Sequence, residues 1–300
     1  MRLNPAERDP IKAADWVELE VLYSEVDSLS FEALRSQIDI DGTLFEGKDE
    51  VGEPEALSYE RSESLVASTV VEIDRRRRIV GDAYPFERSD GRLQLRADLE
   101  TCIPYVFCLL AADRQFYLPT DQALARLFEH LTREALAVYL GGDAVRFGAP
   151  RDMMPPGIQD AVDELARLTN DERIGVYPVN DTDKDLGLDV AGWKDFPDRY
   201  ISKLEVYMQC ATGENWTTKK SQCDLSVWDS ILKCSNDRLK GLAIPYVVAE
   251  GEEWKRSALG LLFMDRLRIA SVLSGRELPN NEYNWWRWCR ERIRLGREQG

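Results

Sequence analysis

Strand-like segments are concentrated in one part of this chain. Four short runs rich in β-branched and aromatic residues fall between residues 173 and 249, and they read RIGVYPV, GLDVAGW, KLEVYMQCA and GLAIPYVVA. A helical pattern, GIQDAVDELARLTND, precedes the first run, and a helix-compatible stretch at 224–233 separates the third from the fourth. The order helix, three strands, helix and strand predicts an α/β core over residues 157–249.

The residues before this core favour helices. Apolar positions recur every three or four residues in four stretches, 11–37, 59–78, 98–112 and 121–140. The last stretch ends at a pair of glycines, a natural helix stop, and Asp90 followed by Gly91 indicates a hairpin turn. We therefore expect an α+β protein. Residues 1–150 would form a mostly helical recognition or regulatory domain, and residues 151–300 would carry the core and C-terminal helices.

The chain is acidic, with a formal net charge of −15 over 300 residues. Such a charge repels polyanions at long range and argues against a free-standing DNA binder without sequence preference. A nucleic-acid function would need a local basic face, a metal ion or a partner protein. No run of about 18 apolar residues and no secretory leader occurs, so we expect a cytoplasmic protein with no membrane partner.

Cysteine and histidine usage narrows the possible chemistry. The six cysteines contain no CxxC pair, which favours reduced thiols over a zinc cluster or a disulfide framework. The single histidine, His130, lies in the helical pattern LARLFEHLTREALAVYL and is most simply a packing or surface residue. Mechanisms that need two histidines are excluded, and a Ser-His-Asp triad would depend on this one imidazole.

Two arginine-rich stretches could face phosphates. One is the run of four arginines at 75–78, which is also consistent with a solvated helix end that complements the helix dipole. The other is WWRWCRERIRLGR at 285–297, where Arg287, Arg290, Arg294 and Trp286 are candidate nucleic-acid contacts. A helix with tryptophans packed on the core and arginines in solvent explains this second stretch equally well.

Polar side chains interrupt two of the apolar strands. Glu205 and Gln209 share one face of their strand, and Asp189 lies opposite the packing side chains of the strand before it. If the two strands form a hairpin, Asp189 and Gln209 converge, and such hard oxygen ligands suit Mg²⁺. Glu205 lies about 13 Å from Gln209 along the strand and cannot share the ion. The alternative is that these residues form the solvent face of a half-exposed sheet.

The same residues resemble the core of a known superfamily. An aspartate in the second strand, an acidic or amide residue late in the third, and a following helix and strand are similar to the PD-(D/E)XK, or restriction-endonuclease-like, nucleases. Asp189 in GLDVAGW, Gln209 in LEVYMQCATG and the closing strand GLAIPYV carry the resemblance. More closely, GLDVAGW, QCATGENW, IPYV and FMDRLRI look like an uncharacterised bacterial family of nuclease-like proteins found among phage-defence genes.

The resemblance implies a restriction-endonuclease-like α-β-β-β-α-β core and a role for each matching residue. Asp189 would bind Mg²⁺ or Mn²⁺, and Gln209 would occupy the position of the second acidic ligand. Glu164, in the helix before the first predicted strand, resembles an extra acidic residue that many members carry there. A carboxylate on the helix surface explains Glu164 at least as well.

The chain departs from the family pattern at Ala211, where a lysine is expected. Lys219 or Lys220 would then have to reach back into the site, or the catalytic set is incomplete. We expect a metal-dependent DNA endonuclease that acts as an anti-phage defence effector, with a partner protein or as a homo-oligomer. The alternative is a catalytically degenerate nuclease fold that binds nucleic acid or serves as a scaffold. A small-molecule enzyme finds no support, because no GxGxxG, GxxxxGK[ST] or GxSxG motif occurs.

Overall fold

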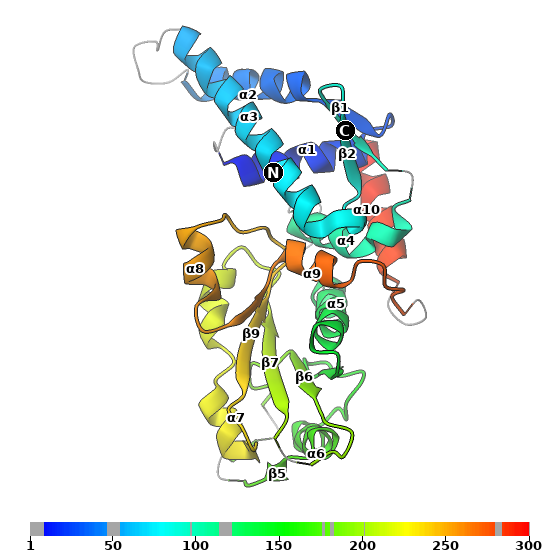
Figure 1. Ribbon diagram of the computed structural model, residues 1–300, viewed down its shortest axis with the longest axis vertical. Helices are drawn as coiled ribbons and strands as arrows, with labels where there is room; N and C mark the ends of the chain where they lie inside the picture. Colours follow the sequence, from blue (N-terminus) through cyan, green and yellow to red (C-terminus); the bar gives the residue numbers. More distant parts are fainter. Residues whose placement is uncertain are drawn as a thin grey trace. The chain divides into compact units, whose positions relative to one another are not determined.

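The computed structural model shows a mixed α and β protein, which confirms the expected class (Figure 1). It describes residues 9–46, 55–96, 98–113, 122–175, 178–180, 183–200, 202–279 and 284–299. The chain divides into two compact units. One comprises residues 1–119 and 274–300, and the other comprises residues 120–273.

The first unit combines helices with a small sheet. Its elements are α1 (Pro10–Tyr23), β1 (Ser28–Ser30), α2 (Phe31–Glu46), α3 (Glu55–Val80), η2 (Gly81–Ala83), β2 (Phe86–Ser89), β3 (Arg92–Leu95), η3 (Glu100–Cys102), α4 (Ile103–Ala112) and α10 (Trp285–Gln299). Strand β3 pairs antiparallel with β1 and with β2. The predicted hairpin is confirmed, because Asp90 and Gly91 join β2 to β3 with φ values of 48° and 70°.

A buried guanidinium holds this unit together. Arg76, within the arginine run of α3, is fully buried and donates hydrogen bonds to Asp15 (2.6 Å), Glu18 (2.9 Å) and Glu72 (2.8 Å). Glu18 also accepts a hydrogen bond of 2.6 Å from Tyr84. Arg76 therefore faces neither solvent nor phosphates, unlike either interpretation of the arginine run. The next two arginines, Arg77 and Arg78, are exposed.

The second unit contains the larger sheet. Its elements are α5 (Gln122–Leu140), β4 (Asp143–Arg146), α6 (Ile158–Thr169), β5 (Glu172–Arg173), β6 (Val190–Lys194), β7 (Leu204–Cys210), η4 (Trp216–Ser221), α7 (Leu225–Ile231), β8 (Leu232–Lys233), β9 (Leu239–Ala243), α8 (Glu252–Ala258), β10 (Leu262–Met264) and α9 (Arg266–Val272). The five-stranded sheet has the order β10-β9-β7-β6-β4. Strand β6 pairs antiparallel with β4 and with β7, which makes these three strands a meander. Strand β9 pairs parallel with β7 and with β10.

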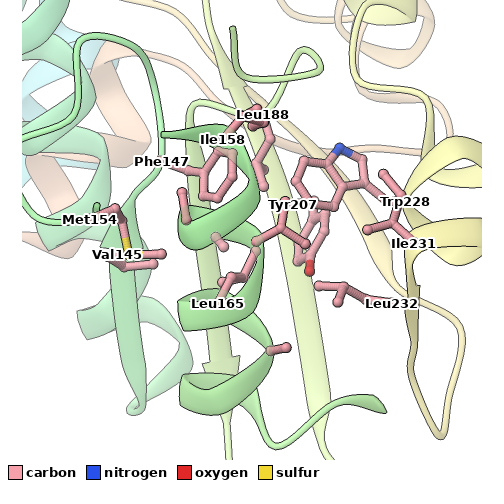
Figure 2. Packing of buried hydrophobic residues seen from close by; sticks show 14 of the residues in the cluster. Val145, Phe147, Met154, Ile158, Leu165, Leu188, Tyr207, Trp228, Ile231 and Leu232 are labelled. Carbon is pink, nitrogen blue, oxygen red and sulfur yellow. The ribbon is translucent and has the colours of Figure 1, made fainter. Parts of the chain in front are cut away.

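Each face of this sheet carries a helical layer. Helices α6 and α7 bury one face, where Tyr207 and Trp228 pack edge to face with ring centroids 5.3 Å apart (Figure 2). Helix α5 packs on β4 and β6 at the other face. Gly192 makes this approach possible, because a Cβ there would lie 2.5 Å from a methyl carbon of Leu136. This packing groups α5 with the sheet and places the boundary near residue 119, before the expected residue 150.

The strand predicted at 173–179 does not belong to the five-stranded sheet. Within it only Arg173 pairs as a strand, in a separate two-stranded sheet with β8, and residues 176 and 177 lie outside the described residues. Strand β4 opens the large sheet instead. Its sequence, DAVR, has too few apolar residues to give a strand pattern. The helix that precedes the first strand is therefore α5.

Other predictions can be compared directly with the structure. The segment 259–273 lies among the expected C-terminal helices, but it forms strand β10 before helix α9. His130 is fully buried, in agreement with the packing interpretation. The six cysteines, all among the described residues, are free thiols. Across the described ranges, no helix combines the length and apolar character needed to cross a bilayer.

Candidate functional site

Asp189 lies where three strands of the sheet meet. It immediately precedes β6, and its backbone N–H donates to the carbonyl of Met208 at 3.0 Å. Its own carbonyl accepts from the N–H groups of Phe147 (2.8 Å) and Gly148 (3.1 Å), which follow β4. Backbone hydrogen bonds to the chain of β7 on one side and to the end of β4 on the other therefore fix this residue.

The Asp189 carboxylate is partly buried and has no neutralising cation at hydrogen-bond distance among the described residues. Its Oδ2 atom accepts a hydrogen bond of 2.7 Å from the N–H of Cys210. Burial, followed by repulsion from the Glu129 carboxylate, raises the pKa of Asp189 well above its usual value, against the opposing effect of that hydrogen bond. The negative form of this side chain is consequently disfavoured unless a cation joins it.

Glu129 brings a second carboxylate to the same place from α5. A Cβ placed on Gly148 would lie 2.6 Å from Glu129 Oε2 and 3.4 Å from Asp189 Oδ1, so both oxygens border the space beside this glycine. Arg146 donates to Glu129 Oε2 at 2.6 Å. Burial nevertheless raises the pKa of Glu129 to about 7, because it outweighs the effect of Arg146.

Arg146 is shared among several acceptors. Besides Glu129, its guanidinium donates to the carbonyl of Pro150 (2.8 Å) and to Asp152 (3.1 Å). Asp152 also lies 2.9 Å from Nε2 of His130, whose pKa is lowered to about 4 by burial. The imidazole is therefore neutral at pH 7. Arg146 serves several carboxylate and carbonyl oxygens at once and does not neutralise Glu129 alone.

Gln209 adjoins the end of the β6–β7 ladder, as Asp189 does. The last pair of this ladder is Val190 with Met208, and Asp189 and Gln209 each lie next to it. The Gln209 side chain is 6% exposed, and its Nε2 donates to Gln222 Oε1 at 2.8 Å. Its own Oε1 is buried and accepts no hydrogen bond from the described chain.

The two candidate lysines differ in their surroundings. Lys219 Nζ donates to Gln222 Oε1 at 3.0 Å, so it shares an acceptor with Gln209. Lys220 Nζ donates to the carbonyl of Arg256 at 3.0 Å and lies 5.7 Å from the ring centroid of Trp216. The structure thus links Lys219, and not Lys220, to the candidate site.

The two remaining acidic candidates do not join Asp189. Glu164 is partly exposed on α6 and pairs with Arg167 at 2.6 Å. Glu205 is buried and pairs with Lys203 (2.8 Å) and Arg238 (2.9 Å), as expected for a residue too far along β7 to share an ion with Gln209.

Glu205 belongs to a cluster with Asp171 and Cys234, whose side-chain ligand atoms lie within 4.8 Å of one another. Lys203 and Arg238 both approach Asp171 at 2.7 Å, so two cations already neutralise the two carboxylates. We interpret this cluster as a buried ion-pair network that connects the end of α6 to β7, and not as a metal centre.

Helix α10 carries the candidate nucleic-acid contacts of the first unit. Arg287, Arg290 and Arg294 are exposed at helical spacing, and the Arg290 guanidinium lies 5.4 Å from the ring centroid of Trp286. Arg294 pairs with Glu298 at 2.5 Å. This arrangement combines packed tryptophans with arginines in solvent, and it also leaves Arg287 and Arg290 accessible to phosphates.

Sequence reasoning missed Glu129. The sequence predicts the helix that carries it, but the family pattern indicates Glu164, because α6 precedes the first predicted strand. Only the position of β4 in the sheet shows that α5 is the helix adjoining the site. The glycine pair at 141–142 followed by DAVRFG could have signalled this short strand.

Comparison with known proteins gives no match. The search found no matching protein-family model, no matching curated protein and no matching solved structure.

Proposed function

We propose that residues 120–273 form a metal-dependent nuclease domain of the PD-(D/E)XK type that hydrolyses phosphodiester bonds in DNA. The observation that carries this proposal is the convergence of Glu129 and Asp189 beside Gly148. The sheet supports it, because α5, the antiparallel strands β4, β6 and β7, helix α7 and the parallel strand β9 occur in this order along the chain. This is the element order of the superfamily that the sequence resembles. Helix α6 and β5 are inserted between β4 and β6, and η4 and β8 flank α7.

The donor set fits Mg²⁺ or Mn²⁺. Asp189 and Glu129 offer carboxylate oxygens, and Gln209 offers a buried amide oxygen that accepts no hydrogen bond within the described residues. Hard divalent cations prefer oxygen ligands, and Mg²⁺ is commonly held by one or two carboxylates and several waters. A bound cation would also relieve the repulsion between two carboxylates whose pKa values are both raised.

Each residue has a defined task in this proposal. Asp189, Glu129 and Gln209 would hold the ion, which would supply Lewis-acid polarisation of the phosphoryl oxygen and lower the pKa of a bound water. Lys219 replaces the lysine absent at Ala211 and stabilises negative charge on the phosphate. Lys220 and Glu164 have no direct role here, because one packs on Trp216 and the other pairs on the surface of α6.

The acidic charge of the chain suggests how the activity is restrained. At a net charge of −15, DNA is repelled at long range, and a partner protein or a second copy would have to deliver the substrate. Arg287, Arg290, Arg294 and Trp286 would add contacts to the DNA backbone. A role in anti-phage defence rests on the sequence resemblance. A catalytically inactive nuclease fold remains the second candidate, favoured by the alanine at position 211.

The proposal is tested by incubating supercoiled plasmid and linear DNA with the full chain. We expect nicking or cutting with Mg²⁺ or Mn²⁺ and none with a chelator, because the proposed reaction depends on the ion to polarise the phosphoryl oxygen and to activate water. The substrate should be tested at low and moderate salt, since the acidic chain binds DNA weakly. Folded protein that binds Mn²⁺ but never cuts DNA, alone or with candidate partner proteins, would favour the inactive fold.

Metal binding is expected to strengthen as the pH rises through about 7. Burial raises the pKa of Glu129 from 4.5 to about 7, and the cation binds only the ionised carboxylate. Affinity should rise by up to about tenfold per pH unit below this value and level off above it. The folding stability of the metal-free protein should change in the opposite direction with pH. Because the folded chain binds this proton more tightly than the unfolded chain, its stability falls between pH 4.5 and about 7.

The rise in melting temperature caused by Mn²⁺ at pH 6, 7 and 8 measures this dependence. Glu129→Gln should weaken binding and flatten its pH dependence, since the amide keeps an acceptor for Arg146 but cannot ionise. A wild-type shift that does not change between pH 6 and pH 8 would remove Glu129 from the ligand set.

A further inference from the structure

We infer that Gln222 is a positioning residue of the proposed site, which orients the Gln209 amide and holds Lys219 beside it. This inference rests on the proposed metal site and adds a residue that neither the sequence pattern nor the family resemblance singles out. Gln222 follows η4 and does not lie on a strand of the sheet.

One oxygen of Gln222 serves two donors. Its Oε1 accepts a hydrogen bond of 2.8 Å from Gln209 Nε2 and one of 3.0 Å from Lys219 Nζ. An amide oxygen has two lone pairs, so these two bonds use its accepting capacity fully. Gln222 therefore connects the Gln209 side chain with Lys219, the candidate lysine that shares its oxygen.

The bond from Gln209 fixes the orientation of its amide. Since Nε2 is directed at Gln222, Oε1 points away from Gln222 within the amide plane. That oxygen is buried on a side chain that is 6% exposed, and no described residue donates to it. A buried acceptor without a donor is unfavourable, and a bound cation would satisfy it. The residue after Gln209, Cys210, donates its N–H to the Asp189 carboxylate at 2.7 Å.

The backbone of Gln222 is held against the segment that leads to Asp189. A Cβ on Gly187 would lie 2.2 Å from the carbonyl oxygen of Gln222 and 2.6 Å from its carbonyl carbon. Gly187 also has a φ of +75°, which favours glycine. Asp185 fixes the same turn by accepting from the N–H of Gly187 at 2.9 Å. Gln222 thus lies between the turn before Asp189 and the side chain of Gln209.

Loss of the Gln222 oxygen should change the orientation of the Gln209 amide and have little effect on the stability of the fold. Without this acceptor, the amide can rotate and present its NH₂ group in place of its oxygen, which removes a ligand atom. Gln222 is exposed, so its replacement opens no cavity in the core. Residues that orient metal ligands in this way typically contribute about 10- to 100-fold to affinity.

Calorimetric titration of the full chain with Mn²⁺ tests the inference. Gln222→Leu removes the acceptor at similar size and should weaken binding by about 10- to 100-fold. Gln222→Glu keeps the acceptor and should bind at least as tightly as the wild type. Lys219→Met leaves the bond from Gln209 intact, so Mn²⁺ affinity should stay within about threefold while DNA cleavage falls. Lys220→Met is the matched control and should change neither.

The outcomes separate the positioning role from the proposed function. Wild-type affinity in a folded Gln222→Leu variant overturns the inference, as does an equal loss of affinity in Gln222→Leu and Lys219→Met. If Asp189→Asn abolishes Mn²⁺ binding but Gln222→Leu does not affect it, only the positioning role fails. A wild-type chain that binds no Mn²⁺ overturns the proposed function and, with it, the inference.

Discussion

Asp189→Asn is expected to reduce metal-dependent DNA cleavage by about a thousandfold. The substitution removes the charge of a residue whose backbone is bonded to β7 and to the end of β4. A catalytic metal ion lowers the barrier by several kcal/mol, and about 1.4 kcal/mol corresponds to each factor of ten. The amide keeps an acceptor for the N–H of Cys210, which Asp189 contacts at 2.7 Å, so the local structure should persist. Single-turnover cleavage of a labelled duplex measures the loss.

The same substitution should stabilise the metal-free protein. Asp189 and Glu129 repel each other, and removing one charge relieves this repulsion. At pH 8 we expect the melting temperature without metal to rise by about 2–4 °C, which corresponds to about 1 kcal/mol for a unit of this size. The rise caused by Mn²⁺ should disappear. Activity lost together with stability gained is typical of a functional carboxylate, because a structural one would lose stability.

Asp237→Asn provides the matched control, since Asp237 is exposed and accepts no hydrogen bond from the described residues. Cleavage and melting temperature should both stay at wild-type values. If Asp189→Asn cuts DNA at the wild-type rate, the cleavage comes from another site or another protein. If it destabilises the metal-free chain, Asp189 has a structural role and the proposed metal site loses its main residue.

The sequence indicated two members of the proposed site, Asp189 and Gln209, but not the third. Alternation along two apolar strands predicts that Asp189 and Gln209 converge. In the structure, the two residues each adjoin the last pair of the β6–β7 ladder, Val190 with Met208. Glu129 could not be found in the same way, because it comes from a helix on another part of the sequence. Its position depends on which strand opens the sheet, and DAVR has no strand-like pattern of its own.

Buried charges were the other feature that the sequence could not predict. The arginine run at 75–78 has the composition of a solvated helix end, yet α3 packs Arg76 against two carboxylates of α1. Asp15 and Glu18 also lie in a helical pattern where acidic residues are usually exposed. Charge pairing across helices depends on tertiary packing, so no local pattern distinguishes Arg76 from Arg77 and Arg78.

Arg76→Met is expected to lower the stability of the first unit by about 3–5 kcal/mol. Methionine fills part of the volume, but it leaves Glu18 and Asp15 buried without their cation, which is the costly way to break a buried ion pair. Arg76 also donates to the carbonyl of Ile11 at 2.9 Å, so α1 loses a further connection to α3. Hydrogen exchange of peptides from α1 and α3 reports this loss without requiring the whole chain to unfold in one step.

Arg88→Met is the matched control for the buried arginine. Arg88 pairs with Asp74 at 2.9 Å, but their side chains are 42% and 45% exposed, so the substitution should cost less than about 1 kcal/mol. The α5, β6 and β7 peptides should keep wild-type exchange in both variants, because the second unit has its own core. If Arg76→Met and Arg88→Met cost the same, the buried network does not hold α1 to α3, and apolar packing alone must stabilise that unit.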